Sequence, residues 1–151
     1  MGVEENIAYN AFLIGQSLLG MRVADVLAAI KKLTSKVQPR QIVLCGRRDA
    51  ALMASFTAAI EPAVTGVALE EMLLSFTSLF AASGIAINAA SILPRMLRDY
   101  GDLADLFAAI APRPVLVAQS VGMLERSPAS IRVEKGRFTE DPRMLTKWLT
   151  E

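Results

Sequence analysis

The sequence predicts an α/β fold, a three-layer sandwich of about four parallel strands flanked by helices. Short apolar runs at 41–45, 64–69, 115–118 and 131–134 are typical of strands, and helical patterns separate them. Strands that alternate with helices indicate βαβ units, in which the strands are parallel and the crossovers right-handed. We therefore expect one sheet with its strands in sequential order. The chain of 151 residues is expected to form a single domain.

The sharpest local signal lies between the first strand and the helix after it. The apolar run of this strand stops at Gly46, and a helical pattern rich in small residues covers 49–60. In many hydrolases, a strand that turns at once into a helix at the top of a parallel sheet holds the attacking nucleophile. The continuous apolar run predicts a strand covered on both faces. Cys45 is therefore expected to be a buried structural thiol.

Helical patterns also predict the elements around the strands. The amino-terminal part is expected to form helices over 4–19 and 21–37, separated at Gly20. A further helix is expected over 85–100, with Pro94 as a break or kink. Asp102 is expected to cap the helix that follows, and Asp141 to cap the last helix with Pro142 at its first position. The inner face of that last helix is predicted to consist of Met144, Leu145, Trp148 and Leu149.

Composition limits the possible functions. The chain has 16 basic and 15 acidic residues without a basic block, so we do not expect nucleic acid as a partner. It contains no histidine, the commonest general base and metal ligand, and one cysteine, so we expect no metal site and no cofactor. No signal pattern and no apolar run near ~20 residues is present, which predicts a cytoplasmic protein without a membrane partner. The apolar share of 53% exceeds what a small solitary domain needs, so some apolar surface is expected in an interface.

Four segments in the same order carry a resemblance to a known family. They are SLLGMRVADVLAAIKKL at 17–33, QIVLCGRRDAALMASFTAA at 41–59, YGDLADLFAAIAPRPVLV at 100–117, and EKGRF with MLTKWL at 134–149. The chain resembles the carboxyl-terminal half of α/β-hydrolases, especially acetyl xylan esterase-like and dienelactone hydrolase-like members. The resemblance implies a half-length α/β-hydrolase-like domain over 1–151 that lacks the first four strands of the family's sheet.

The resemblance also assigns degenerate positions to the catalytic triad of such enzymes. The serine nucleophile corresponds to Arg48, and the closing glycine of the turn to Ala50. The acid falls among Gln119, Ser120, Val121 and Gly122, with Glu125 a few residues later, and the histidine corresponds to Arg137. Arginine stays protonated and is not a nucleophile at working pH. We therefore expect no catalytic residue in this chain.

Charged residues near the turn allow two interpretations. Arg47, Arg48 and Asp49 form a candidate anion site, because helix amides and guanidinium groups suit a carboxylate or a phosphate. Alternatively, an Arg–Asp pair neutralises and caps the turn. Glu70 and Glu71, which follow the second strand, are expected to be surface acids, and Arg113 is expected to pair with a nearby acid or carbonyl.

Three functions remain open from the sequence. The first is a non-catalytic domain that forms a homodimer, or binds a partner, at the open sheet edge of 41–45. The second is an esterase-type hydrolase with weak or altered activity. The third is a small-anion binding module at the Arg47–Arg48 turn.

Overall fold

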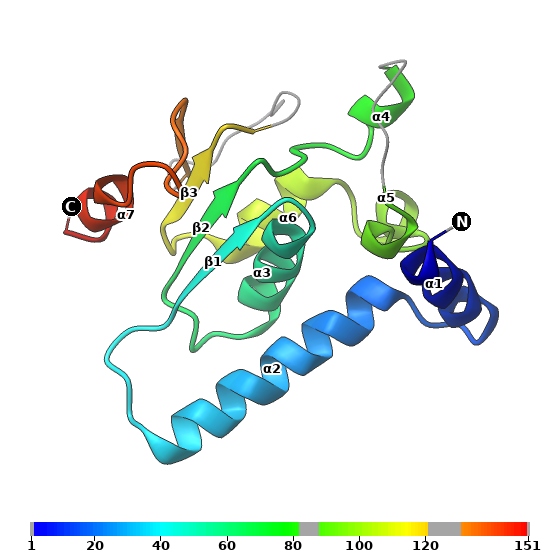
Figure 1. Cartoon of the computed structure of the whole chain (residues 1–151), viewed down its shortest axis with the longest axis horizontal. Coiled ribbons are helices and arrows are strands. Elements are labelled where there is room, and N and C mark those ends of the chain that lie inside the picture. The colour runs from blue at the N-terminus through cyan, green and yellow to red at the C-terminus, as the bar shows by residue number, and fades with distance from the viewer. Residues whose placement is uncertain (1, 82–87, 121–130, 151) are drawn as a thin grey trace.

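The computed structural model describes residues 2–81, 88–120 and 131–150, and it contains one parallel sheet (Figure 1). Its strands are β1 (Val43–Arg47), β2 (Gly66–Glu70), β3 (Val115–Ala118) and β4 (Ile131–Glu134). The spatial order is β1-β2-β3-β4, and every neighbouring pair is parallel. The predicted α/β class, the parallel sheet and the sequential strand order are therefore confirmed.

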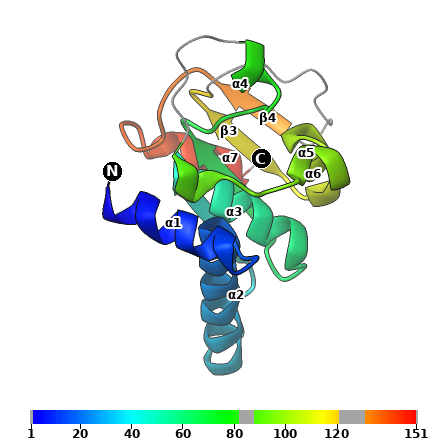
Figure 2. The same cartoon turned by 90° about the vertical axis from the view of Figure 1, so that its right-hand side faces the viewer.

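Helices flank this sheet on both faces. They are α1 (Val3–Leu13), α2 (Leu18–Lys36), α3 (Asp49–Ile60), α4 (Ser78–Ala81), α5 (Met96–Asp99), α6 (Leu103–Ile110) and α7 (Arg143–Thr150), with a short 3-10 turn η1 (Ala89–Ser91). Figure 2 shows α2 extending away from the rest of the molecule, beneath α3.

The alternation of side chains along β2 and β3 separates two layers of core. Val67, Leu69, Val115 and Val117 pack with residues of α2, α3 and α6. Ala68, Leu116 and Ala118 point the other way and pack with Phe138 and with Trp148 of α7. Because successive strand residues face opposite sides of a sheet, one apolar run supplies both layers. The continuous apolar pattern of these two central strands thus reflects cover on both faces.

Strand β1 differs from the prediction because it lies at an edge of the sheet. Val43 and Leu44 are only partly buried, and Cys45 is exposed rather than buried. The apolar run is as continuous as in β2, but the sequence alone does not say how many strands lie beyond it. The prediction of a buried structural thiol was therefore wrong.

Two helix predictions also need correction. The break between the amino-terminal helices lies at residues 14–17, where Gly15 has a φ of 73°, and Gly20 lies inside α2. Ser17 caps α2 by accepting a hydrogen bond from the Gly20 amide at 3.0 Å, so the capping serine decides the boundary. The helix expected over 85–100 is replaced, within 88–100, by η1 and α5, with Arg95 at a φ of 68° between them. Residues 85–87 lie outside the described part of the chain.

The predicted capping residues are confirmed. Asp102 begins α6, and its Oδ1 accepts from the Leu103 amide at 2.7 Å. Asp141 accepts from the Arg143 amide at 3.2 Å at the start of α7. Arg113 donates to the carbonyls of Ile110, Glu61 and Val64, each at 3.0 Å, as expected for a carbonyl partner. Leu149 is exposed and does not belong to the inner face of α7.

No single helix in the described ranges is both long and apolar enough to cross a membrane. The consecutive helices α1 and α2 together have sufficient length and apolar composition, but a bend of 94° separates them.

Candidate functional site

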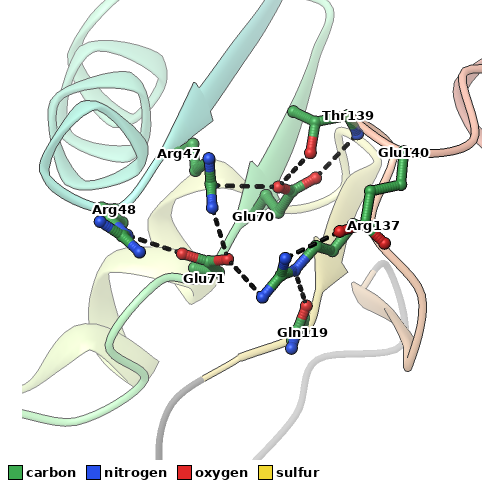
Figure 3. Close-up of polar contacts among 8 residues, drawn as sticks. All are labelled: Arg47, Arg48, Glu70, Glu71, Gln119, Arg137, Thr139 and Glu140. Atoms are coloured by element: carbon green, nitrogen blue, oxygen red, sulfur yellow. Dashed lines mark hydrogen bonds and ion pairs between the residues drawn. The ribbon is translucent and has the colours of Figure 1, made fainter.

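The candidate site lies at the carboxyl ends of β1, β2 and β3, next to the segment that leads from β4 to α7 (Figure 3). The residues that follow these strands are Arg48, Glu71 and Gln119, with φ values of 55°, 51° and 45°. Positive φ is uncommon for residues other than glycine and concentrates at functional sites and sharp turns. Each chain segment therefore turns abruptly here, which brings polar side chains from three strands together at the carboxyl end of the sheet.

The turn after β1 is tight because β1 and α3 approach closely. A Cβ atom on Gly46 would lie 2.3 Å from the Ala50 carbonyl oxygen, so only glycine fits this position. The Arg48 amide donates to the carbonyl of Glu70 at 2.9 Å, which ties the turn to the end of β2. Asp49 then occupies the first turn of α3, where a negative charge suits the helix dipole.

Glu71 is the centre of the charged cluster, although the sequence predicted a surface acid. Its Oε1 lies 2.8 Å from Nη2 of Arg47 and 3.0 Å from Nη2 of Arg137, and its Oε2 lies 2.7 Å from Nε of Arg48. Only 10% of its side chain is exposed. Hydrogen bonds from Arg47 and then Arg48 lower the pKa of Glu71 from 4.5 to about 2, so this carboxylate stays charged at any physiological pH.

Glu70 is fully buried, and this also contradicts the prediction of a surface acid. Thr139 holds its carboxylate from the segment after β4, with Oγ1 donating at 2.6 Å and the backbone amide at 3.0 Å. Nε of Arg47 lies 3.3 Å from Glu70 Oε1. A buried carboxylate needs such partners because desolvation of an unpaired charge is costly. Glu70 therefore fixes the segment between β4 and α7 against the end of β2.

Arg137 links the remaining parts of the cluster. Its Nε donates to Oε1 of Gln119, and its Nη1 lies 2.7 Å from Oε1 of Glu140. The cluster therefore sets the guanidinium groups of Arg47, Arg48 and Arg137 against the carboxylates of Glu70, Glu71 and Glu140. The three positive charges of these arginines balance the three negative charges of these glutamates.

The structure brings together most of the residues that the sequence singled out. Arg48 and Arg137 share the carboxylate of Glu71, although 89 positions separate them along the chain. Ser120 is half-buried and directly follows Gln119, whose side chain contacts Arg137. Val121, Gly122 and Glu125 lie outside the described residues.

Asp49 has a different partner from the one expected. Arg47 and Arg48 pair with glutamates at the end of β2, whereas Oδ2 of Asp49 accepts from Nδ2 of Asn88 at 3.4 Å. The same amide group donates to Glu4 of α1 at 3.1 Å, so Asn88 joins α1 to the start of α3. The Arg–Asp pair proposed from the sequence is therefore replaced by Arg–Glu pairs.

The sequence analysis did not predict the contacts that Glu70, Glu71 and Thr139 make here, and it named Gln119 only as a position for the acid of the triad. One available signal was the position of the two glutamates, directly after a central parallel strand. Carboxyl ends of parallel strands meet at one edge of the sheet, so two acids there lie close to arginines that follow the neighbouring strand. The partner Thr139 had no comparable signal, because its position depends on how the segment after β4 folds back.

The charged side chains described at this end of the sheet form ion pairs with one another. Each guanidinium group is protonated and already faces a carboxylate, so an incoming anion has to compete with Glu70 and Glu71. Within the described ranges, no group of three or more cysteine, aspartate or glutamate side chains is arranged to hold a metal ion.

A second concave region lies away from this edge. A groove of about 690 Å³ runs between the end of α3, the α5 region and α6, and apolar side chains such as Phe56, Leu93 and Leu106 line much of it. Arg95 and Asp99 at this groove form an ion pair of 2.9 Å with each other. The groove is also lined by Asp105, whose Oδ2 accepts from the Asp102 amide at 2.9 Å, so its lining combines apolar side chains with a few charged ones.

A scan of the sequence against protein-family models finds no match, and a search among curated proteins finds none either.

Proposed function

We propose that this chain is a non-catalytic domain related to the α/β-hydrolases, and that it acts by associating with another polypeptide chain. The observation that carries the proposal is the residue after β1. Where a hydrolase of this kind holds its nucleophile, the turn presents Arg48, whose guanidinium group is engaged by Glu71 at 2.7 Å. The two other positions that correspond to a triad hold Ser120 and Arg137.

The chemistry of acyl transfer supports the first half of the proposal. An attacking hydroxyl or thiol needs a base that removes its proton, and the sequence contains no histidine to do so. Loss of triad members costs on the order of 10⁴–10⁶ in rate. The network of arginines and glutamates at this edge supports a structural role, since it joins the ends of β1, β2 and the segment after β4 through paired charges.

The surface of the fold supports the second half. Among the strands of the described residues, β1 has a neighbour on one side only, and an open strand edge is a template for another chain. Large apolar side chains are exposed on α1 and on the linker that follows it, including Val3, Leu13 and Ile14. A second copy of the chain and a different protein are both possible partners under this proposal.

An esterase assay with p-nitrophenyl acetate tests the absence of catalysis. We expect the wild-type chain and the Arg48→Ala and Asp49→Ala variants to give the same rate as buffer, beside an active serine esterase as positive control. Turnover by the wild type that disappears in Arg48→Ala or Asp49→Ala would refute the proposal and establish the esterase alternative.

Thermal shift measurements test the anion alternative. We expect inorganic phosphate and acetate to change the Tm of the wild type and the Tm of Arg48→Ala by the same amount, because the guanidinium groups already have carboxylate partners. A rise in Tm that occurs in wild type and is lost in Arg48→Ala would instead favour an anion-binding module.

A further inference from the structure

Helix α1 is attached to the rest of the fold through small side chains. In α1, all of which the structure describes, the buried residues are Ala8 and Ala11. Ala8 packs in one apolar cluster with Leu18 of α2 and with the two alanines of η1. Figures 1 and 2 show α1 at the amino-terminal end of α2. Because hydrophobic stabilisation grows with the apolar area that is buried, contacts of this size hold α1 only loosely.

Glu4 gives α1 a polar anchor on the same surface. Its Oε1 pairs with Nη2 of Arg22 on α2, and its Oε2 accepts from Nδ2 of Asn88 at 3.1 Å. We call the surface that receives α1 the α1 seat, and its residues are Leu18, Arg22 and 88–90. A helix that docks in this seat needs small side chains and one carboxylate opposite Arg22, and α1 has both.

The linker between α1 and α2 is short, and its closed form depends on one glycine. Residues 14–17 separate the two helices, which are bent by 94° relative to each other. The Gly15 amide donates to the Phe12 carbonyl at 3.0 Å and the Gln16 amide to the Ala11 carbonyl at 2.9 Å, a Schellman motif that ends α1. Gly15 has a φ of 73°, which a residue with a side chain adopts at a cost. Short hinges of this kind favour the exchange of a terminal element between copies of a chain.

Apolar side chains gather around this hinge without cover. Leu13 is 85% exposed, Ile14 is 72% exposed, and Met21 in the first turns of α2 is exposed as well. Met21 lines a hollow of about 350 Å³ together with Gln16 and Ser17 of the linker. When two copies exchange a terminal helix about a two-fold axis, their hinges lie beside each other. Exchange would therefore bury the apolar surface that the hinge exposes in a single chain.

We propose that α1 exchanges between two copies of this chain, so that each copy places its α1 in the α1 seat of the other. The occupant is the helix that the structure shows in this seat, and Glu4 of one copy pairs with Arg22 of the other. The closed monomer and the exchanged dimer share these contacts and differ in the hinge. The inference rests on the proposed function, and it specifies the partner as a second copy and the contact as the α1 seat.

A substitution in the hinge tests the exchange through the equilibrium between monomer and dimer. In Gly15→Ala, the added Cβ would meet no atom within 4 Å, so the change acts on the backbone alone. It penalises the turn with positive φ and thereby favours an open hinge. Sedimentation equilibrium should give an association constant at least tenfold above that of the wild type. The matched control is Gly2→Ala, where a Cβ also meets nothing within 4 Å and φ is −77°, and it should behave as the wild type.

A mixture of two charge-reversal variants tests where the dimer contact lies. Glu4→Arg and Arg22→Glu each place like charges in the α1 seat, both in the closed chain and in an exchanged homodimer. An exchanged heterodimer of the two variants has opposite charges in both seats, so the mixture should contain at least fivefold more dimer than either variant alone. The double variant Glu4→Arg, Arg22→Glu restores the pair within one chain and should behave as the wild type.

The outcomes separate this inference from the proposed function. A gain of dimer in Gly15→Ala and in the mixture supports the exchange. The exchange is overturned if Gly15→Ala, folded by circular dichroism, gains no more dimer than Gly2→Ala, or if the mixture contains no more dimer than its components. A dimer found under either of these conditions forms at another surface and leaves the proposed function intact. Ester turnover by the wild type would refute the proposed function itself.

Discussion

Replacement of Gly46 by alanine tests how closely β1 and α3 approach at the turn. The added Cβ would lie 2.3 Å from O and 2.6 Å from C of Ala50, and 2.7 Å from Cα of Ala51. Non-bonded carbon atoms lie about 3.5–4.0 Å apart, so the start of α3 has to move by about 1 Å. All three atoms belong to the backbone, and no side-chain rotation relieves the contact.

The cost follows from what α3 carries into the core. Leu52 and Phe56 of this helix belong to the buried core on this face of the sheet, so a shift of its first turn disturbs packing along its length. Overpacking of this kind destabilises by about 2–3 kcal/mol. For a domain of this size that corresponds to a fall in Tm of about 5–10 °C.

Urea denaturation followed by circular dichroism measures this loss for Gly46→Ala. The matched control is Gly136→Ala, where the added Cβ would meet only Cε of Met144, at 2.7 Å, the end of a flexible side chain. We expect the control to remain within about 0.5 kcal/mol of the wild type. If Gly46→Ala unfolds at the wild-type midpoint with an unchanged slope, then the close approach at this turn, and the site geometry built on it, is wrong.

The remaining predictions concern the acids of the fold. The pKa of Glu71 is lowered in the folded state, so its contribution to stability is present above about pH 4.5 and is lost as the pH falls toward 2. In Glu71→Gln, the unfolding free energy should therefore fall less steeply over this pH range than in the wild type. The same acid profile in both proteins would contradict the ion-pair network. Thr139→Val should destabilise the fold by about 1.5–3 kcal/mol in urea denaturation, because buried Glu70 loses a hydrogen bond. Thr139→Ser keeps the hydroxyl and should unfold near the wild-type midpoint. If Thr139→Val is as stable as Thr139→Ser, the role of Thr139 as a partner of Glu70 is refuted. Burial pushes the pKa of Asp102 upward, but hydrogen bonds from Ser75 and from backbone amides lower it to about 2, so Asp102→Asn should also remove acid sensitivity between about pH 4 and 2, as a pH series of thermal melts would detect.

The local pattern of the sequence was enough to predict the class of fold. The apolar runs that became β2 and β3 alternate with helical patterns, and a parallel sheet in sequential order is the simplest structure that buries them. Capping residues were equally readable, since Asp102 and Asp141 act on amides a few positions away. These features depend on short stretches of chain, and the same physics holds in any tertiary context.

Only the tertiary structure decided which residues lie at an edge and which acids meet which arginines. Cys45 and Val67 stand in similar apolar runs, yet one is exposed and the other fully buried, because exposure depends on the number of strands beside each. Glu71 became the centre of the candidate site through contacts with Arg48, which follows β1, and with Arg137, which follows β4. Charge pairing across the carboxyl ends of strands depends on their spatial order and on turns with positive φ. A linear pattern of residue types encodes neither feature directly, and both appear only when the chain is folded.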